Sequence, residues 1–464
     1  MIDKKHSKYF KKLLGEDNAH DDQAHNLSYS YDASRVRRAM PDMVLFPRDE
    51  QDISDILRYC NKNLINIVPR GAGSAQTGAQ IATRGGVILA FEKHMNKILE
   101  IDMDNMVAVV QPGVINRDLQ RAVEKVGLFY PPDPASQDFS SIGGNVVENA
   151  GGMRAAKYGI TKDFVLGLRA VLPNGDIIRA GKKTIKDVAG YNICGTVIGS
   201  EGTLAAVSEI TLKLISKPNF KSTCMGLFKT IDDAMNAVYK TMASGVVPVA
   251  MEFMDQLSIR AVKMKYPHID LPEEAGAILI SEVDSNTKND IGYQMEVIEK
   301  YFMDNGAFEF RVAKNDEEAQ KLWFARRNGS TSLLVYNSLK LNEDITVPRS
   351  NLPEMLRRIQ RIEKEFDLLI PCYGHAGDGN IHTHVMVDGS DQDHIAHGHK
   401  CVEAIFKDTV ELGGTISGEH GIGTTKAPYM KLAFNEEEMN LFRTLKKAFD
   451  PNNILNPGKL GIDD

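Results

Sequence analysis

Two histidines and a carboxylate stand in glycine-rich segments whose spacing could bring them onto one metal ion. Asp378-Gly379 is a hairpin-type turn, so the chain before it is expected to pair with the chain after it. The strand after the turn alternates, so His382 and His384 share one face, and His375 lies across the turn, where it could converge with His382 on one metal ion. Glu419 would be a third ligand and would leave a coordination position open for substrate. The pattern therefore predicts a divalent metal site.

His420 follows the candidate ligand Glu419 directly. Glycines within residues 417–423 leave the backbone free to aim both side chains inward. An imidazole beside a metal site is suited to act as a general base. Cys372 is a weaker candidate ligand, because a thiolate suits only zinc-like metals. The alternative is that these histidines are structural residues that form hydrogen bonds near turns.

Two glycine-rich stretches upstream predict a cradle for a bound polar molecule. Residues 130–159, YPPDPASQDFSSIGGNVVENAGGMRAAKYG, show no helical or strand periodicity, and their paired glycines let backbone N–H groups approach a ligand. Residues 69–78, PRGAGSAQTG, follow a short apolar strand and offer three glycines, two hydroxyls and an arginine to phosphate groups. The alternatives are a solvated loop for the first stretch and a glycine-rich connector for the second.

The shorter stretch matches neither of two common nucleotide-binding motifs. Gly73 and Gly78 have the spacing of a P-loop, but Ala79 and Gln80 follow where Lys and Ser or Thr are required. A Rossmann fingerprint needs its glycines to open a helix, and the glycine pair at residues 85–86 breaks any helix soon after the loop. A different kind of phosphate cradle is therefore expected.

The elements that must position these groups form two sets, and the predicted fold class is α+β. The first set consists of loose helices in residues 1–35, strands at 65–68, 86–91, 107–111, 164–172 and 210–215, and helices starting at Asp49 and over 115–126. The second set consists of strands at 224–228, 249–253, 277–283, 308–312, 345–347, 369–373 and 381–387, alternating with helices at 231–243, 255–265, 288–305, 316–335, 352–366 and 392–412. We expect a helical extension at 1–35, one domain at 36–217, a second at 218–425 and a returning segment at 426–464.

Length and composition limit the class of protein. A chain of 464 residues predicts two domains, and 42% hydrophobic with 25% charged residues is typical of a soluble globular protein. The net charge of −7 argues against nucleic-acid binding. No apolar run has the length of a signal peptide or a membrane helix, so a cytoplasmic protein is expected. The five cysteines are scattered, which predicts neither a disulfide framework nor an iron–sulfur cluster.

Nine motifs occur in order and together resemble one family. They are PRGAGSAQTGA (69–79), PPDPAS (131–136), SIGGNVVENAGG (141–152), KYGIT (157–161), KDVAGYN (186–192), GSEGTL (199–204), GHAGDGNIH (374–382), SGEHGIG (417–423) and DPNNILNPGK (450–459). The chain resembles the FAD-dependent D-2-hydroxyacid dehydrogenases, vanillyl-alcohol-oxidase-type flavoproteins that include D-lactate dehydrogenase and the FAD-binding subunit of glycolate oxidase. The resemblance implies an FAD-binding domain of two subdomains, an α+β cap domain and a C-terminal segment that returns to the FAD site.

The resemblance also implies which residues hold FAD. The pyrophosphate would lie on residues 70–78. This loop has Ser74 and neither His nor Cys, whereas some relatives attach FAD covalently through a histidine there, so non-covalent FAD is expected. The implied FAD-binding residues are Arg70, Gly71, Ala72, Gly73, Ser74, Gln76, Thr77, Gly78, Pro132, Ser136, Ser141, Gly143, Gly144, Asn145, Asn149, Gly151, Gly152, Tyr158, Gly159, Glu201, Gly202, Ile210 and Asn456.

For the substrate, the resemblance points to the cap domain. It assigns the divalent metal, Zn, Mn or Fe, to His375, His382 and Glu419. It assigns the base to His420 and the substrate carboxylate to Arg326, which agrees with the bidentate fit of a guanidinium to a carboxylate. Residues 342–348 are acidic where several relatives have a lysine, which favours a small monocarboxylate.

The expected function is therefore FAD-dependent oxidation of a small D-2-hydroxy acid, D-lactate or glycolate, to the 2-oxo acid, with hydride passing to flavin N5. Electrons would leave to a quinone, a cytochrome or an iron–sulfur partner subunit, and such a partner could hold the protein at the inner membrane. A homodimer is compatible with this function. The alternatives are a non-redox flavin transferase like the ether-lipid synthase, a zinc hydrolase without flavin, and an FAD-binding subunit active only in a multi-subunit glycolate oxidase.

Overall fold

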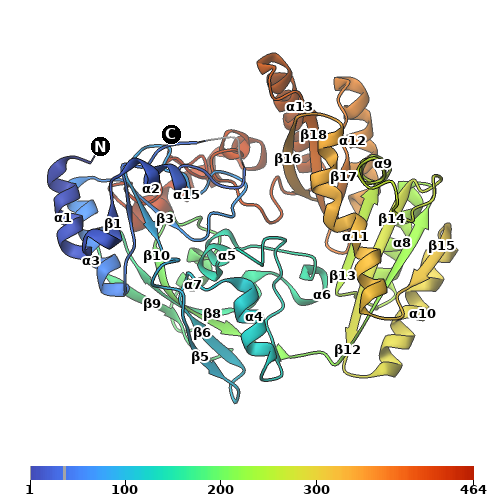
Figure 1. The fold of residues 1–464 in the computed structure, drawn as a ribbon, viewed down its shortest axis with the longest axis horizontal. Coiled ribbons are helices and arrows are strands. Elements are labelled where there is room, and N and C mark those ends of the chain that lie inside the picture. Colours follow the sequence, from blue (N-terminus) through green and yellow to red (C-terminus); the bar gives the residue numbers. More distant parts are fainter. Residues whose placement is uncertain (1, 35–37, 464) are drawn as a thin grey trace. The chain divides into compact units, whose positions relative to one another are not determined.

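The computed structural model describes residues 2–34 and 38–463, which form two compact units (Figure 1). Unit 1 contains the described parts of Met1–Gly151, Gly159–Lys217 and Glu419–Asp464. Unit 2 contains Gly152–Tyr158 and Pro218–Gly418. The chain thus returns to unit 1 at Glu419, before the expected residue 426. A short segment of the long glycine-rich stretch, Gly152–Tyr158, belongs to unit 2.

The first part of unit 1 is a four-stranded sheet in the order β1-β2-β4-β3. Its elements are α1 (Lys4–Leu14), β1 (Ala19–His20), α2 (Gln23–Ser28), β2 (Met43–Leu45), α3 (Glu50–Asn63), β3 (Ile67–Arg70) and β4 (Val87–Ala90). The Asp49 side chain caps α3 by accepting the N–H of Asp52, as predicted. The apolar face of α3, including Ile53 and Ile56, is fully buried with the strands. This packing fixes the end of β3, where the shorter glycine-rich loop begins.

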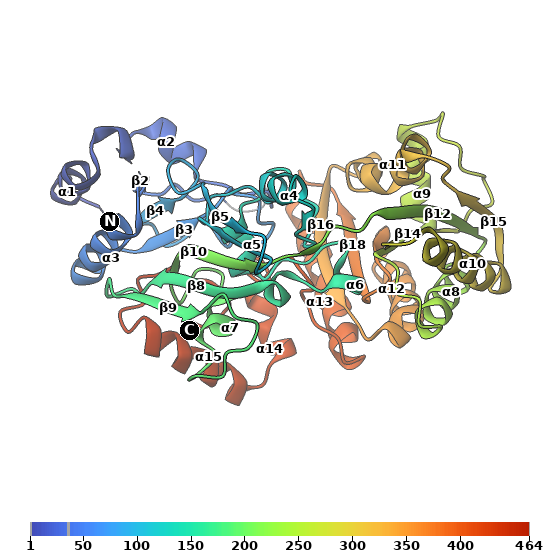
Figure 2. The ribbon, with the colours of Figure 1, turned by 90° about the horizontal axis from the view of Figure 1, so that it is seen from below.

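The second part of unit 1 is a five-stranded antiparallel sheet in the order β5-β6-β10-β8-β9. Its elements are β5 (Ile98–Asp102), β6 (Val107–Val110), α4 (Asn116–Glu124), β8 (Val165–Val171), β9 (Ile177–Gly181), α7 (Ile193–Val197) and β10 (Ala206–Lys213), and β7 (Leu128–Phe129) pairs separately with β11 (Ile215–Ser216). The C-terminal helices α14 (Met430–Ala433) and α15 (Glu436–Phe449) also belong to unit 1 (Figure 2).

The long glycine-rich stretch is less irregular than its sequence suggests. It contains two short helices, α5 (Ile142–Glu148) and α6 (Ala155–Tyr158). Ser141 caps α5 by accepting the N–H of Gly144 at 3.3 Å. Gly143 packs so closely on Pro112 that a Cβ would lie 2.5 Å from the proline Cβ. The prediction of a wholly irregular loop was therefore wrong, because helices this short carry no detectable periodicity.

Unit 2 is built on one antiparallel sheet of seven strands in the order β15-β12-β14-β13-β17-β18-β16. Its elements are β12 (Phe220–Phe228), α8 (Ile231–Ala243), β13 (Ala250–Asp255), α9 (Gln256–Lys265), β14 (Ala277–Ser285), α10 (Lys288–Asp304), β15 (Ala307–Val312), α11 (Asp316–Ser332), β16 (Leu339–Thr346), α12 (Leu352–Phe366), β17 (Cys372–His375), β18 (Asn380–Val387) and α13 (Gln392–Glu411). Helices α9 and α11 cover one face, and α8, α10, α12 and α13 cover the other (Figure 2). The expected alternation of strands and helices is confirmed. Among the described helices, none is both long and apolar enough to cross a membrane.

A buried lysine anchors the C-terminal segment of unit 1. The ammonium of Lys446 donates to the Asp450 carboxylate at 2.6 Å and to the backbone oxygens of Leu455 and Thr203 at 2.7 and 2.9 Å. Asp450 is 1% exposed and also accepts the N–H of Leu455. Burial lowers the pKa of Lys446. Lys446 and Asp450 therefore need each other, because either charge would be buried without a counterion if the other residue were removed.

Replacing Lys446 by methionine is expected to lower the free energy of unfolding of unit 1 by about 3–5 kcal/mol, because a buried carboxylate loses its counterion. Urea unfolding followed by circular dichroism measures the change. Lys447→Met removes an exposed lysine from the same helix and is the matched control. Equal unfolding of the two variants would contradict the anchoring role of Lys446.

Candidate functional site

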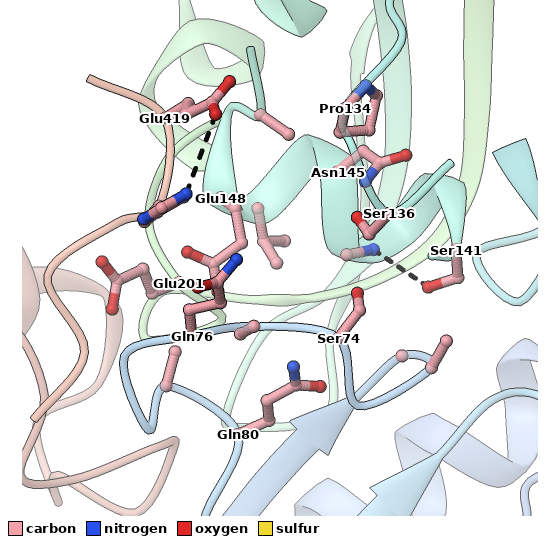
Figure 3. A pocket seen from close by; sticks show the side chains of 18 of the residues that line it. Ser74, Gln76, Gln80, Pro134, Ser136, Ser141, Asn145, Glu148, Glu201 and Glu419 are labelled. Carbon is pink, nitrogen blue, oxygen red and sulfur yellow. Dashed lines mark hydrogen bonds and ion pairs between the residues drawn. The ribbon is translucent and has the colours of Figure 1, made fainter. Parts of the chain in front are cut away.

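A cavity in unit 1 is lined by the two glycine-rich segments and the C-terminal return (Figure 3). It is lined by Pro69, Gly71, Ala72, Ser74, Ala75, Gln76, Ala79, Gln80, Pro134, Ala135, Ser136, Ser141, Gly144, Asn145, Val147, Glu148, Ala150, Gly151, Glu201, Glu419 and His420. Gly71 lies directly against Ser141, where a Cβ would overlap the hydroxyl oxygen. Only a glycine there lets the first loop approach the start of α5. Beside its apolar and carboxyl side chains, the cavity wall therefore offers backbone N–H, hydroxyl and amide groups, donors that a phosphate-containing cofactor requires.

The sequence-predicted cofactor residues divide into two groups. Those that line the cavity are Gly71, Ala72, Ser74, Gln76, Ser136, Ser141, Gly144, Asn145, Gly151 and Glu201. Those outside its lining are Arg70, Gly73, Thr77, Gly78, Pro132, Gly143, Asn149, Gly152, Tyr158, Gly159, Gly202, Ile210 and Asn456. Sequence reasoning also missed lining residues, namely Pro69, Ala75, Ala79, Gln80, Pro134, Ala135, Val147, Glu148 and Ala150. All of them except Gln80 lie within the quoted motifs at 69–79, 131–136 and 141–152, which was the signal that could have found them.

Two of the residues outside the lining have clear structural contacts. The Arg70 guanidinium donates to the backbone oxygen of Tyr31 at 2.9 Å and lies 5.3 Å from the ring centre of Tyr29. Tyr158 belongs to unit 2, where its hydroxyl donates to Asp284 at 2.7 Å. Arg70 thus supports the base of the first loop, and Tyr158 holds the short segment of unit 2 in place.

The C-terminal return is tied to the cavity loops by backbone contacts. The side-chain amide of Asn456 donates to the backbone oxygens of Ala79 at 2.9 Å and Glu201 at 2.6 Å. The N–H of Thr424 donates to the backbone oxygen of Thr77 at 2.8 Å. These residues position the lining from behind, although they are distant from it in the sequence.

Two carboxyl groups line the cavity side by side, and one of them binds the C-terminal return. The Glu201 carboxylate accepts the N–H groups of Ile422 at 2.6 Å and Gly423 at 2.7 Å. Burial raises the pKa of Glu201, and these two hydrogen bonds oppose that rise. Burial and the nearby charge of Glu201 raise the pKa of Glu148 well above its usual value.

Glu419 and His420 line the same cavity of unit 1. The Glu419 carboxylate Oε1 lies 3.7 Å from His420 Nε2, a contact that is drawn in Figure 3. Gly151 lies close behind, where a Cβ would be 3.1 Å from the Cβ of Glu419. The two side chains predicted as metal ligand and base thus both face the cofactor cavity.

A second cluster of titratable groups lies within unit 2, on the sheet face covered by α9 and α11. Antiparallel pairing sets Glu252 of β13 directly opposite His375 of β17, and Tyr373 opposite His382 of β18. Side chains directly opposite on one face of a sheet are in contact. The predicted hairpin turn is present over residues 376–379, with Gly379 at φ +90°, and it returns the chain so that both histidines share this face.

The two histidines converge through one nitrogen each. His375 Nε2 lies 3.4 Å from His382 Nε2, and His375 Nδ1 lies 2.5 Å from Glu252 Oε1. His375 and His382 are each 6% exposed, and Glu252 is 0% exposed. A carboxylate on one ring nitrogen holds the proton there and leaves the other nitrogen as a ligand, which is the usual support of a metal-bound histidine. The pair therefore fits a metal ion with imidazole ligands.

Arg326 of α11 joins this cluster from behind. Its Nε donates to Glu252 Oε2 at 2.7 Å, and its guanidinium lies 4.4 Å from the ring centre of Tyr373. Sequence reasoning identified Arg326 but missed Glu252, which has no local motif. The weaker candidate Cys372 is fully buried and donates to the backbone oxygen of Ile370, and burial raises its pKa, so it is a poor ligand.

Comparison with family models matches two parts of the chain. Residues 41–181 match the model described as FAD binding domain. Residues 217–460 match the model described as FAD linked oxidases, C-terminal domain. The two matches cover the two glycine-rich stretches and the histidine cluster, respectively.

Curated relatives match the chain along nearly its full length. It is 44% identical to glycolate oxidase subunit GlcD of Bacillus subtilis, over 100% of this chain and 98% of that protein. It is 33% identical to a D-lactate dehydrogenase of Anaerostipes hadrus, over 97% of this chain and 94% of that protein.

Solved structures show the same fold at low sequence identity. A p-cresol methylhydroxylase with substrate bound has a TM-score of 0.81 at 17% identity, covering 98% of this chain and 96% of that chain. An alkyldihydroxyacetonephosphate synthase has a TM-score of 0.77 at 22% identity, covering 98% and 86%. The expected vanillyl-alcohol-oxidase-type fold is thereby confirmed.

Proposed function

The chain belongs to the FAD-linked oxidases, and from this premise we propose that it oxidises a small D-2-hydroxy acid, D-lactate or glycolate, to the 2-oxo acid. FAD would lie non-covalently in the cavity of unit 1, since the first loop offers Ser74 and neither histidine nor cysteine. The names of full-length relatives, glycolate oxidase subunit and D-lactate dehydrogenase, support this substrate class. The alternative of a zinc hydrolase without flavin is not supported, because both matching family models describe FAD-linked proteins.

The observation that carries the proposal is the buried pair His375 and His382, with Glu252 behind it. Two imidazole nitrogens 3.4 Å apart, one of them oriented by a carboxylate, suit a divalent metal. When bound, such a metal would hold the hydroxyl and carboxylate of the substrate and lower the hydroxyl pKa, and FAD would accept the hydride.

Glu419 is the proposed third ligand, and chain connectivity supports it. Its neighbour Gly418 donates its N–H to the backbone oxygen of Asp344 at 3.0 Å and to the Asp344 carboxylate at 2.9 Å. Asp344 of β16 is paired directly with His382 of β18. The peptide bond from Gly418 to Glu419 therefore leaves the sheet next to the ligand-bearing strand.

His420 and Arg326 are proposed for the remaining chemistry. The His420 imidazole would take the proton of the substrate hydroxyl as it is oxidised. The Nε of Arg326 donates to Glu252, so the two terminal nitrogens of the guanidinium would be the ones that bind the substrate carboxylate. The acidic residues 342–348 offer no cation for a second carboxylate, which favours a monocarboxylic acid.

Anaerobic absorbance spectra test the proposal. D-lactate or glycolate is expected to bleach the yellow flavin spectrum of the purified protein, and prior chelation is expected to prevent bleaching. L-lactate and D-2-hydroxyglutarate are the controls for stereochemistry and for a second carboxylate. A flavin spectrum that neither D-lactate nor glycolate changes would contradict the proposed substrate class and favour the flavin transferase.

A second candidate is the FAD-binding subunit of a multi-subunit glycolate oxidase, which the name of the Bacillus relative favours. Electrons would then pass to an iron–sulfur partner, whereas a free-standing enzyme would pass them to a quinone or a cytochrome. Turnover by the isolated chain with a quinone or a cytochrome as acceptor separates the two, because a subunit that passes electrons only to an iron–sulfur partner would bleach without turning over.

A further inference from the structure

Glu148 is a carboxyl group in the cofactor cavity that the proposed chemistry does not use. It is the last residue of α5, and it points into the cavity between Gln76 and Glu201 (Figure 3). Its Oε2 is buried, and within the described chain no group forms a hydrogen bond to it. A buried polar atom without a partner costs free energy, and an atom of this kind that faces a cavity can be satisfied by a bound ligand.

The neighbouring carboxyl group decides which form Glu148 takes. A Cβ at Gly421 would overlap Glu148 Oε2 and would lie 2.9 Å from Glu201 Oε1, so both carboxyl groups converge on one glycine. Two carboxyl groups that share a buried place do not both ionise. Glu201 accepts two backbone N–H groups, which favours its charged form, and the proton therefore belongs on Glu148.

The other charges around the pair agree with this assignment. Asp32 adds a negative charge that further disfavours ionised Glu148. Lys426 and Lys459 act on Glu201 and stabilise its charged form. His420 also lines the cavity, and its Nε2 lies 3.7 Å from Glu419 Oε1. Lys426 and Lys459 thus stabilise the ionised form of Glu201, and Glu148 is the carboxyl group of the pair that keeps its proton.

We propose that Glu148 is a cofactor-binding residue, whose carboxyl group stays protonated in the cavity and donates a hydrogen bond to an acceptor atom of FAD. The proposal rests on FAD occupying this cavity. A neutral acid suits the site because its O–H can donate to one of the oxygen or nitrogen acceptors of FAD, whereas an ionised carboxylate can only accept. FAD would supply the partner that Glu148 Oε2 lacks.

Two variants separate hydrogen bonding from shape. Glu148→Gln keeps a donor that cannot ionise, and Glu148→Leu keeps a similar volume without a donor. Titration of the apoprotein with FAD, followed by flavin fluorescence, is expected to give the glutamine variant an affinity within about threefold of the wild type. The leucine variant is expected to bind FAD about tenfold more weakly. Glu437→Gln, an exposed glutamate in the same unit, is the control for loss of surface charge.

Infrared difference spectra test the protonation state directly. Photoreduction of bound FAD changes the hydrogen bonds of the cavity, so the carbonyl stretch of a protonated carboxyl group should appear in the wild-type difference spectrum. The same band should be absent from Glu148→Gln. Equal FAD affinities of the glutamine and leucine variants, or identical spectra of wild type and Glu148→Gln, would overturn the proposal.

These outcomes are distinct from failure of the proposed function. If no hydroxy acid bleaches the flavin, the substrate assignment fails while the FAD titration and the infrared spectra still decide the role of Glu148. If the wild-type protein binds no FAD at all, the proposed function and the role of Glu148 both fall.

Discussion

Replacing His382 by alanine is expected to lower kcat for the 2-hydroxy acid by about a thousandfold while FAD stays bound. His382 supplies one of two buried imidazole nitrogens that lie 3.4 Å apart in unit 2. Without it, the proposed site keeps only His375 and Glu419, too few ligands to hold the metal ion firmly, and the substrate hydroxyl would lose the group that lowers its pKa. The FAD cavity is retained because its lining belongs to unit 1.

Three measurements on this variant separate the metal from the flavin. Elemental analysis should find the metal lost, the flavin absorbance should be unchanged, and the rate of anaerobic bleaching should fall with kcat. His268→Ala removes an exposed histidine from the same unit and is the matched control. Full turnover of the His382 variant would refute the metal role of the pair.

The variant Glu252→Gln is expected to have a smaller effect on the same metal site. The glutamine can still reach His375 Nδ1 but carries no charge to orient and polarise the imidazole. Loss of such a supporting carboxylate typically weakens metal binding by about 10- to 100-fold. Added metal should therefore restore the activity of Glu252→Gln but not that of His382→Ala. This contrast tests whether Glu252 acts through His375.

Replacing His420 by alanine is expected to lower kcat by about 10²- to 10⁴-fold, with both FAD and metal retained. His420 faces the cofactor cavity beside Glu419, where its imidazole could receive the hydroxyl proton. The loss should appear in the rate of flavin bleaching in stopped-flow absorbance, because proton removal accompanies substrate oxidation.

Rescue by added imidazole distinguishes a general base from a structural residue. A small base that enters the cavity of His420→Ala should restore part of the bleaching rate in proportion to its unprotonated concentration. His420→Phe fills the same space without a base and should not be rescued. A bleaching rate in His420→Ala equal to that of the wild type would exclude the histidine as the base.

Much of the fold was accessible from local sequence patterns. The strands and helices of unit 2 were predicted in order, because their periodicities of two and near 3.6 residues persist over whole elements. The Asp378-Gly379 turn was predicted from its residue types. The helices α5 and α6 were missed, because seven and four residues are too few to establish a period.

The candidate site was predicted in part, for reasons that differ between residues. Ten of the predicted FAD residues line the cavity, because the glycine motifs mark where backbone must approach a ligand. Arg70 stands in the same motif but bonds to Tyr31, a residue that no local pattern connects to it. A motif therefore located the loop without determining which of its side chains face the ligand.

The sequence by itself determined the family, the two glycine-rich segments and the histidine pair, because each is a local motif of residues close together in the chain. Tertiary structure alone decided the partners of these groups. Glu252 meets His375 across 123 residues of chain, through the pairing of β13 with β17. Glu148 and Glu201 converge on Gly421 because the C-terminal segment returns to unit 1. Such contacts set the charge and orientation of each group, and they depend on sheet register and chain return, which no local stretch of sequence encodes.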